Sequence, residues 1–289
     1  MLFRSKMQDR QGFYRTFING QRELSAQLED YAWYLSALIK LYDSDENPLW
    51  LQRAEIIANT IDVEFTDKDQ GGLFQTAKSQ INYLPIRPKS SVDKTLPSAT
   101  AIASQAMIRL TRRTGNQRYR LIAENIFASF AADAVENPLA HATLLLASRE
   151  YYQQPNQLPI YAARGNIRVH AQMSALTDNT YKLRIEIKIH NDWHINAQLP
   201  LDKNLIGTQL QINTASAWTL LNTQYPQPKL TTLGFSDEPL ALYTDTVEIY
   251  AETNRGKTDR NPLLQLKLQA CNDQLCLPEE VLIFLPVVR

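Results

Sequence analysis

The stretch Tyr181-Lys182-Leu183-Arg184-Ile185-Glu186-Ile187-Lys188-Ile189 alternates apolar and polar side chains with a period of two. Successive side chains of a β-strand point to opposite faces, so this pattern predicts a strand with one buried face. The same alternation precedes it at Ile167, Val169, Ala171 and Met173. Further short strands are expected at residues 209–213, 219–223, 247–252, 264–270 and 281–285. A run of short strands separated by turn-rich loops predicts a β-sandwich.

Before residue 154 the apolar residues recur at helical spacing instead. Leu28, Tyr31, Leu35, Leu38 and Tyr42 define one amphipathic segment. A second segment runs from Pro48 to Phe65, with Pro48 suited to the first turn and Asn47 to the cap. We expect further helices from Ser98 or Thr100 to Gly115, over 117–130 and over 138–152, and a turn into a short strand at 71–74. This half is predicted to be a helical array.

The fold class that follows is α + β, with a helical domain over residues 1–153 and a β domain over 166–289. Residues 154–165 contain Gln154-Pro155-Asn156-Gln157-Leu158-Pro159 and are expected to be a linker. Two domains also suit the length of 289 residues.

Composition argues against two classes of partner. The chain has 30 basic and 30 acidic residues, and no basic run or basic-aromatic stripe marks a nucleic-acid surface. No apolar run approaches the roughly 20 residues that cross a bilayer. The start, Met1-Leu2-Phe3-Arg4-Ser5-Lys6, lacks the apolar segment of a signal peptide. We therefore expect neither nucleic-acid binding nor a membrane span.

The two cysteines of the chain lie close together, in Gln269-Ala270-Cys271-Asn272-Asp273-Gln274-Leu275-Cys276-Leu277-Pro278. A disulfide that closes so small a loop stabilises a fold by roughly 2 kcal/mol. That is little for a domain with its own core. We therefore interpret the pair as redox-active rather than as a disulfide that only stabilises the fold. A structural disulfide or two buried free thiols are the alternatives that spacing leaves open.

Residues 165–287 resemble the N-terminal domain of the DsbD thiol:disulfide interchange proteins. The resemblance rests on Asp192-Trp193-His194-Ile195-Asn196-Ala197, on residues 225–229 and 242–245, and on the cysteine loop with its Leu277-Pro278 tail. It implies an immunoglobulin-like domain in which Cys271 and Cys276 exchange electrons with a thioredoxin-like partner, by attack of a thiolate on one sulfur and resolution by the other. It also implies a shielding cap at Asp237, Glu238 and Leu240, and a sulfur pocket lined by Tyr243 and His194. Pro239-Leu240 stands where an aromatic pair is expected.

Residues 1–150 resemble the C-terminal part of the YyaL and spermatogenesis-associated protein 20 family, in which a thioredoxin-like domain precedes an (α/α)6 toroid. The matching pieces are residues 28–32, 71–74, 87–89, Asp93 and 96–98. The resemblance implies a partial toroid, because five helices cannot close a twelve-helix ring. The missing part then belongs to a longer chain or to another polypeptide.

A toroid pocket would contain Glu29, Asp30, Tyr31, Arg87, Lys89 and Asp93, a set suited to carbohydrate hydroxyls and acid/base work. The alternative is structural. Glu29 and Asp30 would favour the positive end of their helix, and Arg87 and Lys89 would pair with them.

A zinc site built from His190, His194, Cys271 and Cys276 has formally suitable spacing. The end of a strand does not make the two histidines converge, so we expect no metal and no other cofactor.

Three hypotheses of function follow. The first is a thiol:disulfide oxidoreductase that works with a thioredoxin-like protein or domain. The second is a carbohydrate-binding or sugar-modifying toroid whose β domain is a docking module, and the third is a non-catalytic scaffold. The DsbD-like domain favours the periplasm, whereas the start of the chain suggests no export.

Overall fold

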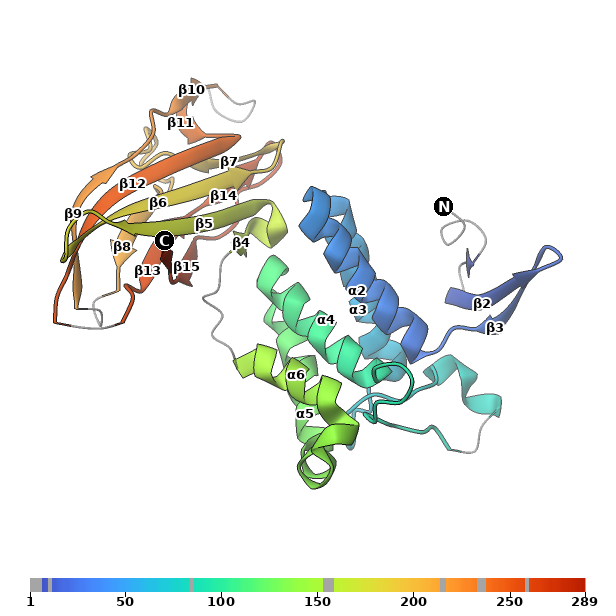
Figure 1. Cartoon of the computed structure of the whole chain (residues 1–289). Coiled ribbons are helices and arrows are strands. Elements are labelled where there is room, and N and C mark those ends of the chain that lie inside the picture. Colours follow the sequence, from blue (N-terminus) through green and yellow to red (C-terminus); the bar gives the residue numbers. More distant parts are fainter. Residues whose placement is uncertain are drawn as a thin grey trace. The chain divides into compact units, whose positions relative to one another are not determined.

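The computed structural model describes residues 7–9, 12–83, 86–152, 159–213, 217–232, 238–257 and 260–288. The chain divides into two compact units. The first consists of Met1–Thr111 with Asn116–Gln153, and the second of Arg112–Gly115 with Gln154–Arg289. Figure 1 shows that the first unit is mainly helical and the second is built of β-strands.

The described part of the helical unit contains five α-helices, as the apolar spacing predicted. Two short 3-10 helices, η1 and η2, accompany them. The helices are α2 (Leu28–Asp45), α3 (Pro48–Phe65), α4 (Ala99–Thr114), α5 (Gln117–Glu136) and α6 (Ala142–Tyr152), with η1 at Lys78–Tyr83 and η2 at Pro138–His141. The residues that carry the helical spacing face inward: Leu28, Leu35 and Ile61 have no measurable exposure.

Local hydrogen bonds decide where the helices begin. The Asn47 side chain accepts a bond from the main-chain N of Leu49, 3.0 Å away, at the start of α3. Asn116 does the same for the N of Arg118 at 3.1 Å, at the start of α5. These asparagines satisfy N–H groups that have no partner within the helix. The predicted cap at Asn47 is confirmed.

The sequence analysis missed a β-hairpin that precedes α2. Its strands are β2 (Gly12–Ile18) and β3 (Gln21–Ser25), with the short β1 (Gln8–Asp9) beside β2. Most of its side chains are exposed, so the strands carry little alternation. The dipeptide Asn19-Gly20, which suits a tight hairpin turn, was the available signal. Phe13 anchors the hairpin, because its ring lies 5.1 Å from that of Tyr31 in α2.

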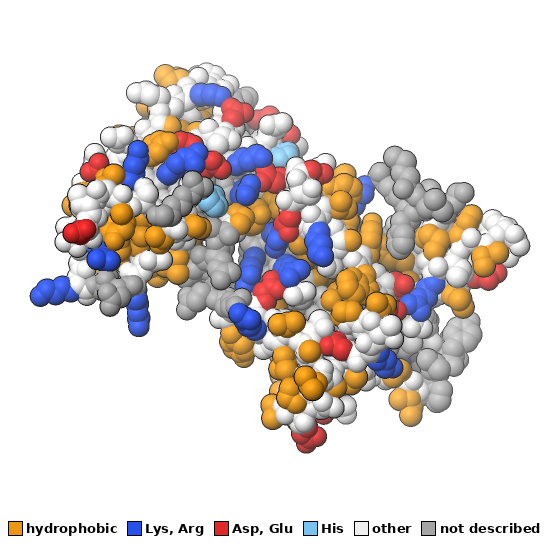
Figure 2. Space-filling model, viewed as in Figure 1, with side chains coloured by type: hydrophobic (Ala, Val, Ile, Leu, Met, Phe, Trp, Pro, Cys, Tyr) orange, Lys and Arg blue, Asp and Glu red, His pale blue; other side chains and the backbone are white. Residues whose placement is uncertain are grey.

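The helical unit also has an apolar groove of about 470 Å³ between α5 and α6. It is lined largely by Phe127, Ala131, Val135, Leu144, Leu145 and Tyr152. Val135 is 79% exposed and Tyr152 is 76% exposed. Figure 2 shows many hydrophobic side chains on the surface of the region where Figure 1 places α5 and α6. The described residues therefore leave this face of the helices uncovered.

In the β unit, the described strands form three sheets, and nearly all their pairings are antiparallel. A six-stranded sheet has the order β16-β5-β6-β12-β9, with β4 paired to β5. A four-stranded sheet has the order β10-β11-β7-β14, and a three-stranded sheet has the order β15-β13-β8. The strands are β4 (Ile160–Ala162), β5 (Ile167–Ala175), β6 (Thr180–Ile189), β7 (Trp193–Asn196), β8 (Gln209–Ile212), β9 (Trp218–Gln224), β10 (Lys229–Thr231), β11 (Leu240–Tyr243), β12 (Thr246–Arg255), β13 (Leu264–Leu268), β14 (Ala270–Asn272), β15 (Glu280–Phe284) and β16 (Val287–Val288).

The alternation in β5 and β6 buries one face of the six-stranded sheet in a single apolar core. Leu183, Ile185 and Ile187 of β6 are fully buried there, as are Leu264 and Leu266 of β13 on the facing side. Two sheet faces with buried alternate residues form the predicted sandwich. The predicted strand over 264–270 is divided, since β13 ends at Leu268 and β14 starts at Ala270.

Several short strands carried no signal that periodicity could detect. β7, β10, β11 and β14 have three or four residues each, too few to establish a period. Ile160–Ala162, which the sequence analysis placed in the linker, pairs with β5 as β4. No helix among the described residues combines the length and apolarity needed to cross a membrane.

The turn at Gly71-Gly72 depends on left-handed backbone, with φ of +75° and +77°. The strand expected after it is reduced to two single bridges, Thr66 with Leu73 and Phe74 with Lys89. A Cβ on Gly72 would lie 2.8 Å from the Ser129 hydroxyl and 3.1 Å from the Phe130 ring. This position therefore excludes a side chain both by conformation and by contact.

We predict that Gly72→Ala destabilises the helical unit by about 2–4 kcal/mol, from backbone strain and overpacking together. Gly20→Ala is the matched control, since Gly20 has φ +81° and no atom within 4 Å of the added Cβ. It should cost about 1 kcal/mol. Denaturant unfolding followed by far-UV circular dichroism measures both, and equal losses would contradict the steric argument.

Candidate functional site

The two cysteines face each other across a small hairpin. Cys271 and Cys276 are bridged in antiparallel register, their Cα atoms are 4.0 Å apart, and their sulfurs form a disulfide. Main-chain bonds flank the pair on both sides: Asn272 N donates to Leu275 O at 3.0 Å, and Leu277 N donates to Ala270 O at 2.9 Å. These bonds do not involve sulfur. The hairpin therefore aligns the cysteines independently of their bond.

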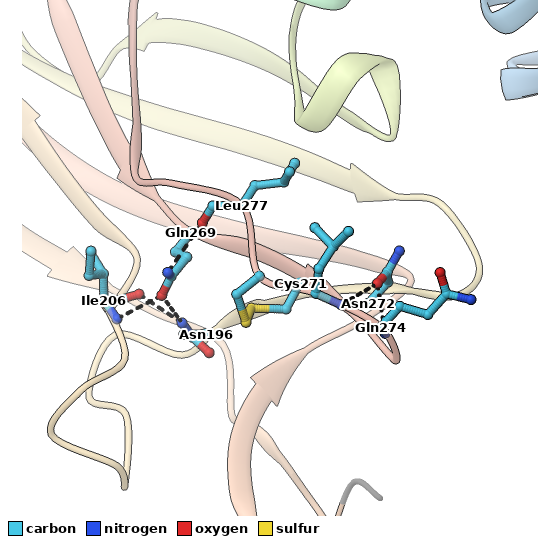
Figure 3. The surroundings of a disulfide bond; sticks show 9 residues. Asn196, Ile206, Gln269, Cys271, Asn272, Gln274 and Leu277 are labelled. Atoms are coloured by element: carbon cyan, nitrogen blue, oxygen red, sulfur yellow. Dashed lines mark hydrogen bonds between the residues drawn. A yellow bond between two sulfur atoms is a disulfide. The ribbon is translucent and has the colours of Figure 1, made fainter. Parts of the chain in front are cut away.

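The Asn272 side chain closes the turn of this hairpin (Figure 3). Its Oδ1 accepts bonds from the main-chain N of Gln274 and of Leu275, both at 2.9 Å. An asparagine that bonds main-chain N–H groups two and three residues ahead stabilises a tight turn. This turn explains why four residues suffice between the two cysteines.

The two cysteines differ sharply in exposure. Cys271 lies in β14 and is 1% exposed, whereas Cys276 is exposed to solvent. Cys276 is therefore the more exposed residue of the pair. The disulfide is chemically unsymmetrical, because thiol exchange depends on which sulfur is attacked.

The pairing of β14 with β7 places His194 directly opposite Cys271. Side chains directly opposite in an antiparallel pair share one face of the sheet. The same face carries Asn196, two residues along β7, and Leu242, which is paired with Asn196. His194 is 5% exposed, Asn196 1% and Leu242 1%. Cys271 therefore lies in a buried patch made from three neighbouring strands.

The residues expected to form the cap and sulfur pocket have different positions. Asp237 lies outside the described residues, and Glu238 is exposed. Leu240 is 3% exposed and shares the sheet face of Leu242 and Cys271. Tyr243 points to the opposite face, where it joins the core and its hydroxyl accepts a bond from Gln198 N at 3.3 Å. Burial raises the pKa of Tyr243.

Burial lowers the pKa of His194 below its ordinary value, and the charge of Asp273 opposes this shift by raising it. Asp273 is exposed in the turn between the cysteines. The neutral imidazole is consequently favoured opposite Cys271. A neutral imidazole offers one nitrogen as a hydrogen-bond acceptor and the other as a donor, so it can interact with a thiol.

Two functional candidates were missed by the sequence analysis, namely Asn196 and Gln269. Asn196 Nδ2 donates to Ile206 O at 3.0 Å and to Gln269 Oε1 at 3.2 Å, while Gln269 Nε2 donates to Leu277 O at 3.2 Å (Figure 3). The available signal was their spacing, because residues two apart in a strand share one face. Asn196 lies two residues after His194, and Gln269 lies two residues before Cys271. Their roles depend on which strands pair, and periodicity does not give that pairing.

The proposed toroid residues at the start of α2 have local partners. Arg15 of the hairpin forms ion pairs with Glu29 at 2.7 Å and with Asp30 at 2.9 Å. Asp30 also accepts a bond from the main-chain N of Gln27 at 2.8 Å. Tyr31 is 7% exposed and packs between Phe13 and Phe65. Arg15, rather than Arg87 or Lys89, is therefore the cation beside these carboxylates.

Arg87 and Lys89 are also engaged within their own loop. Arg87 lies over the Phe74 ring and donates to the main-chain oxygens of Thr76 and Glu64. Lys89 Nζ pairs with Asp67 Oδ2 at 2.8 Å and donates to Gly71 O at 2.9 Å. The Lys89 ammonium, helped by two main-chain N–H donors, lowers the pKa of Asp67 to about 2.

Asp93 joins the starts of two helices. Its Oδ1 accepts a bond from Ser98 N and its Oδ2 accepts one from Thr143 N, both at 2.8 Å. A carboxylate is favoured at such positions by the free N–H groups and the helix dipole. All six proposed toroid residues thus make contacts within the helical unit, and the expected pairing of Arg87 and Lys89 with Glu29 and Asp30 is not among them.

For zinc, the described residues bring no three His, Cys, Asp or Glu side chains together in a cluster suited to a metal ion. In the disulfide form, moreover, Cys271 and Cys276 offer no thiolate ligand.

The β unit is a sandwich that carries the Cys271–Cys276 disulfide at its surface, and the family comparison supports a domain of the thiol:disulfide exchange type. In agreement, residues 167–287 match the family described as thiol:disulfide interchange protein DsbD, N-terminal. DsbD N-terminal domains are immunoglobulin-like β structures.

Solved structures resemble this chain in part. The N-terminal periplasmic domain of ScsB from Proteus mirabilis is 15% identical, with a TM-score of 0.32, and the likeness covers 42% of this chain and 48% of that one. A structure of the complex between the DsbD N-terminal and PilB N-terminal domains from Neisseria meningitidis is 13% identical, with a TM-score of 0.28, over 40% of this chain and 80% of that one.

The N-terminal half is similar to spermatogenesis-associated protein 20. The human protein is 28% identical over 137 residues, which are 47% of this chain and 17% of the human protein. The chain thus corresponds to a small part of that relative's length. Both resemblances noted in the sequence are confirmed.

We predict that Lys89→Met destabilises the helical unit by about 1–2 kcal/mol at neutral pH, and by much less near pH 2. The pKa of Asp67 falls from 3.8 to about 2 on folding, so the carboxylate stabilises the fold above pH 3.8 and this contribution is lost as the pH falls toward 2. Urea unfolding at both pH values measures the difference. Lys68→Met is the control, because Lys68 pairs with Asp62 but is 65% exposed, and its loss should be smaller. A loss for Lys89→Met that does not change with pH would contradict the ion-pair assignment.

We predict that the β unit loses stability as the pH falls below 6.5. The pKa of His194 is lower in the folded state, so the unfolded chain binds a proton first and the folded state is disfavoured below the unfolded value. His194→Phe should flatten this dependence. NMR titration should place the His194 midpoint below 6.5, and Asp273→Asn should lower it further because Asp273 raises this pKa. A midpoint at or above 6.5 would exclude the effect.

Proposed function

We propose that the β unit exchanges electrons with a thioredoxin-like protein or domain through a reversible Cys271–Cys276 disulfide. The observation that supports it most directly is a hairpin that aligns both cysteines and exposes one of them. The match of residues 167–287 to the DsbD N-terminal family supports the same chemistry.

In the first step, a partner thiolate attacks Sγ of the exposed Cys276. The bond between Cys271 and Cys276 breaks, a mixed disulfide forms between the partner and Cys276, and Cys271 leaves with the electron pair. Burial disfavours a thiolate at Cys271, so this sulfur takes up a proton.

In the second step, the other thiolate of the partner attacks the mixed disulfide and releases Cys276. Two electrons and two protons have then passed from the partner's dithiol to Cys271 and Cys276, and the partner carries a disulfide. The reverse sequence oxidises this chain. The hairpin's hydrogen bonds keep the two thiols opposite each other, so the mixed disulfide is resolved without rearrangement of the strand pair.

His194 is the group we assign to proton transfer at Cys271. It lies directly opposite Cys271, and burial lowers its pKa and so favours the neutral imidazole. When Cys271 acts as the attacking thiol, the neutral imidazole opposite it takes the thiol proton as the new S–S bond forms. Asp237, Glu238 and Leu240 remain our proposal for a cap, in which Leu240 contributes apolar contact on the face of Cys271.

The complex with PilB is a property of the Neisseria protein. For this chain we propose a thioredoxin-like partner with an accessible dithiol. The helical unit's role is a separate matter. The local contacts of Glu29, Arg87, Lys89 and Asp93 do not favour a sugar-binding function.

A pair of single-cysteine variants tests the assignment of the attacked sulfur. Cys271→Ser leaves the exposed Cys276, and Cys276→Ser leaves the buried Cys271. We predict that oxidised glutathione modifies Cys271→Ser at least about tenfold faster than Cys276→Ser, because access and thiolate character limit the reaction. Mass spectrometry under native conditions follows the mixed disulfide.

The double variant Cys271→Ser with Cys276→Ser is the control for non-thiol modification. Equal rates for the two single variants would refute the unsymmetrical mechanism. A wild-type disulfide that resists both glutathione and a reduced thioredoxin would refute the exchange function itself.

A further inference from the structure

Asn196 carries a buried acceptor with no partner among the described residues. The residue is 1% exposed, and its Oδ1 makes no hydrogen bond. Buried polar atoms of native proteins are nearly always bonded, so an unpaired one requires an explanation. The residue also lies on the sheet face that carries Cys271, next to His194 along β7.

The orientation of the Asn196 amide follows from its neighbours. Gln269 Oε1 accepts a bond from the main-chain N of Ile206 at 3.1 Å, so that atom is the oxygen of its amide. Asn196 therefore faces two acceptors, Gln269 Oε1 and Ile206 O, and must present its Nδ2 to both. Exchanging the two ends of the Asn196 amide would place oxygen against oxygen. The unpaired atom is consequently Oδ1.

Cys271 is the neighbour that can supply a proton to this oxygen. His194 is paired with Cys271, so Asn196 is the diagonal neighbour of Cys271 across β7 and β14. Diagonal neighbours lie roughly 7–8 Å apart at their Cα atoms, with their Cβ atoms somewhat closer, and these two side chains are on the same face of the sheet. Figure 3 shows the disulfide and the Asn196 side chain together with the bonds of Asn196 to Ile206 and Gln269.

In the disulfide form, Cys271 has no proton to donate. In the dithiol form, it has one S–H group, and a thiol is a weak hydrogen-bond donor. We propose that Asn196 Oδ1 accepts this thiol hydrogen bond in the reduced state, so that reduction satisfies an acceptor that oxidation leaves unpaired. Asn196 is thereby a positioning residue that shifts the redox equilibrium toward the dithiol.

This inference rests on the proposed exchange function, since it concerns the same sulfur pair. The reaction measured is that of the disulfide with two molecules of reduced glutathione, which gives the dithiol and oxidised glutathione. The two glutathione thiols supply both electrons and both protons. Cys271 and Cys276 each receive one proton, and the proton on Cys271 is the one that Asn196 holds.

The test compares the glutathione equilibrium of the wild-type chain with that of Asn196→Leu. The leucine removes the acceptor, so the disulfide should become three- to tenfold harder to reduce, a potential about 15–30 mV more negative. The lost bonds to Ile206 and Gln269 are absent from both redox forms of the variant and cancel in this comparison. Thr208→Val is the matched control, because Thr208 Oγ1 donates to the main-chain O of Asn196 at 2.6 Å, a bond that does not involve the Asn196 amide group. It should change the equilibrium less than twofold.

If Asn196→Leu has the same equilibrium constant with glutathione as the wild-type chain, this inference is overturned and the exchange function is left intact. A wild-type disulfide that glutathione does not reduce would instead overturn the exchange function. If Asn196→Leu does not fold, the variant Cys276→Ser provides a second test, because Cys271 is then its one thiol and Asn196 is unchanged. Infrared spectroscopy should place the S–H stretching band of Cys271 at the frequency of a hydrogen-bonded thiol. A free-thiol frequency would refute the assignment.

Discussion

The antiparallel pairing of β7 with β14 is the constraint on which the candidate site depends. It places Cys271 opposite His194 and makes Asn196 a diagonal neighbour of Cys271 on the same sheet face. Because side chains alternate between faces, a slip of one residue would exchange His194 and Asn196 for core residues such as Ile195. The apolar core on the other face opposes that slip, so core packing positions the polar chemistry.

The hairpin adds a second constraint, on the cysteines themselves. Asn272 and the main-chain bonds at Leu275 and Leu277 hold Cys271 and Cys276 in register without help from sulfur. A disulfide that only stabilised the fold would gain little from so short a loop. A redox pair gains more, because alignment of the two thiols speeds resolution of a mixed disulfide. Burial of one sulfur and exposure of the other then give the reaction an order.

The helical unit uses its charged residues differently. Arg15 joins the hairpin to α2, Lys89 joins two loop segments through Asp67, and Asp93 ties the starts of α4 and α6 together. Each charge is paired or bonded to main-chain groups, as partly buried charges generally must be. The most distinct feature on the surface of this unit is therefore not a charged site but the apolar groove between α5 and α6.

Much of the architecture could be predicted from periodicity, because α2 to α6 and the long strands β5, β6 and β12 each repeat their pattern over enough residues. The cysteine pair could be predicted as well, since two cysteines so close in a chain that has no others stand out by composition alone. The hairpin at Asn19-Gly20 was detectable from its turn residues. Short strands such as β7 and β11 were not detectable, because three or four residues establish no period.

The sequence by itself determined the two fold classes, the presence of a closely spaced cysteine pair and the resemblance of its domain to the DsbD N-terminal domains. Only the tertiary structure decided that Cys276 is the exposed cysteine, that Tyr243 turns to the core, and that the Asn196 and Gln269 side chains bond each other. The physical reason is that burial and hydrogen-bond partners depend on which strands lie side by side. That pairing joins residues more than 70 positions apart, such as Asn196 and Gln269, and local sequence patterns carry no record of it.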